Sequence, residues 1–239
     1  MAKAVFLSNI NLITGNSRHL LKNINLEIEC GDCVAVIGPN GAGKTTILKI
    51  INGLIKQTSG KIEIFNEQIS NKTKNKIGYI PQSNYFDQFL PISVKEVISI
   101  GLSSKYGIFK QFSDYDKQFI ENTAKSVGIF KLLNTPVGKL SGGEAQKLSI
   151  ARVLAQDAKL ILMDEPLSNL DNKAQKDILN IIDGIYNKKQ TTILIVLHNL
   201  SQIPESCNKI LFMSNGEIIK FGKKEDIFNN KLFQELYNL

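Results

Sequence analysis

Long apolar runs are missing from this chain of 239 residues, and none approaches the roughly 20 residues that a membrane-spanning helix needs. The first residues also lack the basic segment and apolar core of a secretory signal peptide. We therefore expect a soluble chain that stays in the cytoplasm. Its composition, 43% hydrophobic and 21% charged, is ordinary for one large globular domain or for a domain with subdomains.

Metal-ligating side chains are scarce as well. The sequence holds three cysteines, too few for a disulfide scaffold, and its only histidines are His19 and His198. Cys30 and Cys33 have the C-x-x-C spacing, but a zinc site would need two more ligands at suitable spacing. A redox pair with this spacing opens a helix, whereas this pair enters a predicted strand. We interpret both cysteines as structural.

A concentrated basic tract is also absent. The net charge is +7, but the lysines are scattered, with only short pairs such as Lys188-Lys189 and Lys223-Lys224. This charge would suit nucleic acid or an anionic membrane face, and it also arises from a general lysine bias. The scatter favours the bias, so we expect no nucleic-acid partner.

What the sequence does contain is a phosphate-binding loop, or P-loop, of the form G-x-x-x-x-G-K-[ST]. Glycines let backbone N–H groups turn toward a triphosphate, and the following helix offers its N-terminal N–H groups. Lys44 adds charge for the β- and γ-phosphates, and Thr45 offers a hydroxyl to Mg²⁺. The apolar run at residues 33–37 predicts the buried strand before the loop, and Gly53 suits the end of the helix after it. The predicted nucleotide-binding residues are Gly38, Pro39, Asn40, Gly41, Ala42, Gly43, Lys44, Thr45 and Thr46.

A second buried strand, predicted at residues 160–165, ends in two acids. Ligands bind at the C-terminal edge of the strands in α/β sheets, which places Asp164 and Glu165 opposite the P-loop lysine. Asp164 suits Mg²⁺, and Glu165 suits the activation of an attacking water. A third buried strand at residues 191–197 ends at His198, and a parallel arrangement would point His198 at the γ-phosphate.

A second anion-binding surface is predicted where a glycine-rich segment opens a helix. Ser141 suits the N-cap and Glu144 the capping-box position, while Gly142 and Gly143 expose backbone N–H groups. Taken alone, this pattern fits an ordinary helix start equally well.

The rest of the chain divides into a β-rich start and a helical middle. Alternating apolar positions predict half-buried strands at residues 24–29 and 61–65, which with a strand at residues 4–7 suggest a small antiparallel β layer beside an α/β core.

The helical pattern begins at Ser83 and extends to about Leu140. One predicted helix begins after Ser93 and ends at Gly101, because glycine commonly terminates helices. Residues 225–239 predict an amphipathic terminal helix.

Together these motifs resemble those of the ATP-binding subunits of ABC transporters, over nearly the whole chain and in the family's order. The matching motifs are Walker A at residues 38–45, the Q-loop glutamine Gln82, the signature Leu140-Ser141-Gly142-Gly143-Glu144, Walker B at residues 160–165, the D-loop Ser168-Asn169-Leu170-Asp171 and the switch histidine His198. The signature is the most specific of them, because most P-loop families lack it.

The resemblance implies an α/β fold of the P-loop NTPase class, with a mostly parallel sheet, an N-terminal antiparallel β subdomain and an inserted α-helical subdomain. We expect a single ABC ATPase domain over residues 1–239. The expected subdomains are the β layer at residues 1–32 and 58–70, the RecA-like core at residues 33–57 and 155–239, and the helices with the signature at residues 83–154.

The resemblance further implies a head-to-tail homodimer, in which each ATP lies between one chain's Walker A and its partner's signature. Ser141, Gly142 and Gly143 would bind in trans the γ-phosphate that Lys44 holds, and Asp171 would contact the partner across the dimer. This arrangement accounts for two anion-binding surfaces in one chain.

The family's catalytic roles carry over residue by residue. Glu165 would be the catalytic base, and His198 would hold the γ-phosphate and the water. Gln82 would sense Mg²⁺, which Thr45 and Asp164 also bind.

ATP and Mg²⁺ are thus the expected substrate and cofactor. Hydrolysis would reopen the dimer and drive integral membrane permease subunits, which receive substrate from an extracytoplasmic binding protein. The chain would then be a peripheral subunit on the cytoplasmic face of the inner membrane.

One departure from the family concerns adenine, which usually stacks on an aromatic residue before the second strand. The corresponding position here is Thr14, or Ile13 if the register slips, with His19 as a substitute. Purine preference is therefore expected to be weaker than usual.

Within the family, residues 82–94 and Glu144 resemble zinc and manganese uptake systems. Tyr85, Phe86 and Phe89 would contact the permease or pack in the helical subdomain. Two alternatives remain: an ABC ATPase for a non-metal substrate, importer or exporter, and a soluble ABC ATPase acting on nucleic acid.

Overall fold

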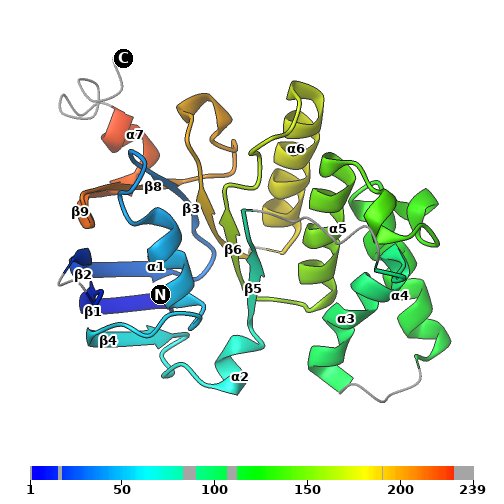
Figure 1. The fold of residues 1–239 in the computed structure, drawn as a ribbon, viewed down its shortest axis with the longest axis horizontal. Coiled ribbons are helices and arrows are strands. Elements are labelled where there is room, and N and C mark those ends of the chain that lie inside the picture. The colour runs from blue at the N-terminus through cyan, green and yellow to red at the C-terminus, as the bar shows by residue number, and fades with distance from the viewer. Residues whose placement is uncertain (1, 16–17, 83–89, 107–111, 190, 229–239) are drawn as a thin grey trace.

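The structure, a computed structural model, describes residues 2–15, 18–82, 90–106, 112–189 and 191–228. Its centre is a six-stranded sheet with the order β5-β6-β7-β3-β8-β9 (Figure 1). Neighbouring strands are parallel except at the edge, where β9 runs antiparallel to β8. The strands are β3 (Cys33–Ile37), β5 (Ile77–Ile80), β6 (Leu160–Asp164), β7 (Thr192–Val196), β8 (Lys209–Ser214) and β9 (Glu217–Lys223).

A second, antiparallel sheet has the order β2-β1-β4 and is formed by β1 (Lys3–Ile13), β2 (His19–Glu29) and β4 (Ser59–Ile64). The first strand is longer than the expected residues 4–7. It is the central strand, so Val5 pairs with Ile28 on one side and with Ile64 on the other, and irregular pairing carries it on to Ile13.

The P-loop helix α1 (Lys44–Ile51) lies between the two sheets. Its apolar side chains, including Ile47 and Ile50, share one core with Val34 and Val36 of β3 and with the antiparallel sheet. Gly53 follows the C-cap of α1 with a φ of 68°, as expected for a glycine that ends a helix.

The opposite face of the six-stranded sheet is covered by helices from the middle of the chain (Figure 1). The longer helices on this face are α3 (Val94–Tyr106), α4 (Asp114–Ser126), α5 (Gly142–Ala155) and α6 (Asn172–Lys189). The short helices of the described chain are α2 (Asn71–Lys74), α7 (Lys224–Phe228), η1 (Phe130–Leu132), η2 (Val137–Lys139) and η3 (Leu200–Gln202). Residues 229–239, most of the predicted terminal helix, lie outside the described residues.

The prediction that a helix ends at Gly101 is wrong, because α3 continues through it to Tyr106. A Cβ atom at Gly101 would overlap the carbonyl oxygen of Arg152 and would lie 2.8 Å from the Cβ of Ala155, both on α5. Gly101 therefore lets the backbones of α3 and α5 approach closely, and the sequence pattern alone does not distinguish this role from helix termination.

The fold confirms the expected class: an α/β core with a mostly parallel sheet, an antiparallel N-terminal sheet and an inserted set of helices. None of the helices in the described parts of the chain has both the length and the hydropathy of a membrane span.

Candidate nucleotide-binding site

The P-loop connects the C-terminal end of β3 to the first turn of α1. Gly38 has a φ of 149°, and a Cβ atom there would overlap the carbonyl oxygen of Met213, so only glycine fits. Lys44 is the first residue of α1 and only 4% exposed. Its Nζ donates hydrogen bonds to the carbonyl oxygens of Gly38 (2.7 Å) and Pro39 (3.0 Å), which holds the ammonium group across the loop.

Burial and nearby negative charges act in opposite directions on the ammonium group of Lys44. Burial lowers the pKa of Lys44, while the negative charges of Glu165 and Asp164 act in the opposite direction. Among the described residues Lys44 has acidic neighbours but no direct ion pair, and a buried cation of this kind is well suited to receive phosphate oxygens.

An acidic group faces the loop from the end of β6. Asp164 is 1% exposed and accepts hydrogen bonds from Thr45 Oγ1 (2.8 Å) at Oδ1 and from Tyr79 Oη (3.3 Å) at Oδ2. Burial raises the pKa of Asp164, and the hydrogen bonds from Thr45 and Tyr79 oppose that rise. A carboxylate and a hydroxyl oxygen in contact are hard donors of the kind that Mg²⁺ prefers, so this pair fits the ion.

The next residue, Glu165, is 9% exposed and contacts the residues that follow the two neighbouring strands. Its Oε2 accepts a hydrogen bond from Gln82 Nε2 (2.5 Å), which follows β5, and its Oε1 lies 2.6 Å from Nε2 of the more exposed His198, which follows β7. Because β5, β6 and β7 are adjacent and parallel, their C-terminal ends bring the three side chains to one point.

The backbone of Glu165 is also unusual. Its φ of 49° is rarely populated by residues other than glycine, and its carbonyl oxygen accepts hydrogen bonds from the N–H and the hydroxyl of Ser168. A costly backbone conformation that aims a carboxylate inward is typical of functional sites.

The signature residues lie elsewhere in the fold. Ser141 is the N-cap of α5 and forms a capping box with Glu144, and both Ser141 and Gly142 are exposed. The helix α5 packs on the face of the sheet opposite to α1, as Figure 1 shows. Asp171 is exposed as well, and its Oδ1 accepts the N–H of Ala174 (2.8 Å) at the start of α6.

The structure therefore gathers one set of predicted residues and leaves another outside. Those that meet at the P-loop edge of the sheet are Lys44, Thr45, Asp164, Glu165, Gln82 and His198. Those that remain apart as an exposed surface are Ser141, Gly142 and Asp171.

Three residues near this site were missed by the sequence reasoning. Arg18 and Leu20 line a cavity of about 210 Å³ together with P-loop residues 41–46. Thr14, the expected adenine position, does not line this cavity; its N–H and hydroxyl donate to the carbonyl oxygen of Arg18 instead (3.0 and 3.2 Å). Tyr79 was the third: it lies in β5, three residues before Gln82, and its sequence position gave no sign that its hydroxyl binds Asp164.

The predicted contact residues Tyr85, Phe86 and Phe89 lie outside the described residues.

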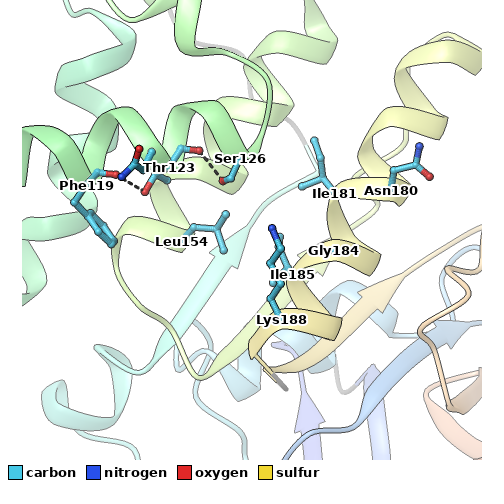
Figure 2. Close-up of a pocket in the computed structure, with 10 residues that line it drawn as sticks. Phe119, Thr123, Ser126, Leu154, Asn180, Ile181, Gly184, Ile185 and Lys188 are labelled. Atoms are coloured by element: carbon cyan, nitrogen blue, oxygen red, sulfur yellow. Dashed lines mark hydrogen bonds between the residues drawn. The ribbon is translucent and has the colours of Figure 1, made fainter.

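A separate cavity of about 540 Å³ lies between α4, α5 and α6 (Figure 2). The hydroxyls of Thr123 and Ser126 on its wall donate to carbonyl oxygens of their own helix, so they are not directed at a ligand. Since its lining includes no residue of the P-loop edge, we assign this cavity no part in nucleotide binding.

Comparisons with known proteins agree with this geometry. A family described as ABC transporter matches residues 21–168. The zinc uptake system ATP-binding protein ZurA of Listeria innocua is 35% identical over 228 residues, which cover 95% of this chain and 88% of ZurA. The manganese transport system ATP-binding protein MntB of Halalkalibacterium halodurans is 32% identical over 217 residues, or 91% of this chain and 85% of MntB. The solved structure of cbiO1 from Clostridium perfringens, described as part of the ABC transporter complex cbiONQ, superimposes with a TM-score of 0.84 at 27% identity, covering 100% of this chain and 95% of cbiO1.

Proposed function

This chain belongs to the family of ABC transporter ATP-binding proteins, and from that premise we propose that it is the energy-coupling ATPase of a divalent metal importer, for zinc or for manganese. Members of this family hydrolyse ATP to power transport. The observation that carries the choice of metal import is the nearly full-length similarity to zinc and manganese uptake ATPases.

ATP binds first through its phosphates. Lys44 reaches the β- and γ-phosphates, and the N–H groups of residues 41–46 surround them at the start of α1. Arg18 and Leu20 form the neighbouring wall of the cavity, where a planar guanidinium stacks on adenine in place of the usual aromatic ring.

Thr45 and Asp164 would hold Mg²⁺. Gln82 would sense the ion, and its hydrogen bond to Glu165 holds it near Asp164. When bound, the ion would neutralise part of the negative charge on the phosphates.

Glu165 is the general base of the reaction. Its carboxylate takes a proton from the water that attacks the γ-phosphorus, and burial strengthens this interaction by excluding bulk solvent. Gln82 and His198 each hold one carboxylate oxygen, so they fix the direction of proton transfer. His198 is half-exposed, and we expect it to hold the γ-phosphate and the attacking water as well.

The second anion-binding surface completes the site in a homodimer. Ser141, Gly142 and Gly143 at the start of α5 bind the γ-phosphate held by the other copy, and Asp171 contacts that copy. The exposure of Ser141 and Gly142 in a single chain supports this arrangement, because these residues lie away from their own P-loop.

The dimer is expected to act as a peripheral subunit at the cytoplasmic face of the inner membrane. It works with integral membrane permease subunits, which receive the metal from an extracytoplasmic binding protein. The description of cbiO1 as part of a transporter complex supports such an assembly.

Affinity purification tests this proposal. We would capture the tagged chain from detergent-solubilised membranes of the native host and identify what copurifies. A polytopic membrane protein is the expected partner, in an amount matching that of the chain. Recovery with ribosomes or nucleic acid, and without a membrane protein, would instead support a soluble ABC ATPase.

A further inference from the structure

Two buried thiols, distant in sequence, meet at the end of the core that is remote from the P-loop. Cys33 is the first residue of β3, and Cys207 precedes β8. Their exposed fractions are 0% and 2%, and their Sγ atoms lie 3.1 Å apart. Both are free thiols, and neither takes part in the ATPase chemistry.

The backbone already holds the two residues side by side. The N–H of Asn208 donates to the carbonyl oxygen of Cys33 (3.0 Å), and the N–H of Cys33 donates to Oδ1 of Asn208 (3.0 Å). The parallel ladder between β3 and β8 begins at the next residues, Val34 and Lys209. A disulfide needs the sulfurs about 2.05 Å apart, so closing the gap calls for a small side-chain movement within a fixed frame.

We propose that Cys33 and Cys207 are a redox pair that forms a reversible intrachain disulfide when the protein meets a peroxide. In a reducing compartment the pair rests as two thiols, and oxidative challenge closes it. The C-x-x-C spacing of Cys30 and Cys33 does not define this pair, because Cys30 is exposed and the sulfur beside Cys33 comes from Cys207.

The chemistry balances with hydrogen peroxide as the oxidant. One thiolate attacks a peroxide oxygen, the O–O bond breaks, and a sulfenic acid forms with the release of hydroxide, which becomes water. The second thiolate attacks that sulfur and displaces the oxygen as a second water, forming the S–S bond. Two thiols are oxidised, one peroxide is reduced, and both thiol protons leave in water.

The residues on either side of Cys207 lie at or near the surface, so the two thiols are not far from solvent. Asn208 is exposed, and the half-buried Ser206 has its Oγ 3.8 Å from Sγ of Cys33. The hydrogen bond to Cys33 and burial raise the pKa of Cys207, which keeps the thiolate scarce. Oxidation is therefore slow in the folded chain and responds to sustained exposure to peroxide.

The consequence of closure is a more stable core. The bond would join residues 174 positions apart, and it would tie the P-loop strand to the segment that follows His198. Cys33 stands at the opposite end of β3 from Gly38, so the bond leaves the P-loop edge untouched. From the loop length, the melting temperature of the oxidised chain should rise by about 10 °C.

The test uses the full chain with Cys30→Ser, which leaves only the two buried thiols. After peroxide treatment we expect the intact mass to fall by two hydrogen atoms, and proteolysis to yield one crosslinked peptide pair containing Cys33 and Cys207. Dithiothreitol should restore both the mass and the original melting temperature.

The matched control is Cys30→Ser with Cys207→Ser, which should show neither the mass loss nor the rise in melting temperature. Two thiols that stay unmodified in the folded Cys30→Ser chain after prolonged exposure to peroxide would overturn the proposal. Irreversible conversion of either cysteine to sulfinic acid without a crosslink would overturn it as well.

Discussion

Replacing Glu165 by glutamine isolates the chemical step from nucleotide binding. The amide has nearly the same volume as the carboxylate but takes no proton from water. General-base catalysis is worth roughly 10²–10⁴-fold, so we expect ATP hydrolysis to fall by about 10³-fold. Lys44 and Thr45 are unchanged, and ATP binding should remain within about threefold of the wild type.

The structural cost of this replacement is small. Glu165 accepts a hydrogen bond from Gln82, and its other carboxylate oxygen lies 2.6 Å from Nε2 of His198. A glutamine amide keeps an acceptor oxygen for one of these partners but presents an N–H group to the other, which costs about 1–2 kcal/mol. For a chain of this length, the melting temperature should therefore fall by no more than about 2–8 °C.

The assay combines phosphate release at saturating MgATP with a nucleotide-binding titration and gel filtration. The mutant should accumulate as an ATP-bound dimer, because hydrolysis no longer reopens it. Glu27→Gln, which removes one partner of the exposed Lys3–Glu27 ion pair, is the matched control and should keep wild-type activity. Hydrolysis by Glu165→Gln within tenfold of the wild type would refute the role of general base, and a strictly monomeric mutant in MgATP would refute the homodimer.

Three further substitutions test other parts of the account. Lys44→Ala should lower ATP hydrolysis by at least about 10²-fold, since it removes the buried ammonium group of the P-loop, and near-normal phosphate release would contradict the P-loop assignment. Arg18→Ala should raise the Kd for ATP about tenfold with little change in kcat, while Lys22→Ala should not; equal Kd values would show that Arg18 does not contact adenine. Gly101→Ala should lower the melting temperature by roughly 2–10 °C in a thermal melt, because its Cβ overlaps the backbone of α5, and an unchanged value would mean that the two helices separate at little cost.

Local chemistry explains which parts of the fold could be predicted from the sequence. The P-loop, the acidic strand end and the capped helix start each depend on residues close together in the chain, so their spacing alone indicates the structure. The buried strands β3, β6 and β7 are short apolar runs, and a sheet with helices on its faces follows from them.

The features that were missed depend on contacts between distant segments. Gly101 has the local pattern of a helix end, and only the approach of α5 shows its other use. Arg18 joins the P-loop because β2 passes beside α1, which no spacing within the sequence reveals. Cys33 and Cys207 meet through the pairing of β3 with β8, and the C-x-x-C spacing of Cys30 and Cys33 gives no sign of this contact.

The adenine position rests on spacing alone and stays a prediction. That spacing points to Thr14, whose N–H and hydroxyl donate to the carbonyl oxygen of Arg18. Arg18 and Leu20 line the cavity beside the P-loop and Thr14 does not, so Arg18 is the residue that we propose for stacking on adenine.

The most direct test of the account measures total cellular zinc and manganese by elemental mass spectrometry. The cells are the native host depleted of this chain and then supplied with either the wild type or Lys44→Ala. We predict that one of the two metals falls on depletion and that only the wild type restores it, because import requires ATP hydrolysis. If neither metal changes while the purified chain still hydrolyses ATP, the assignment to metal import is contradicted.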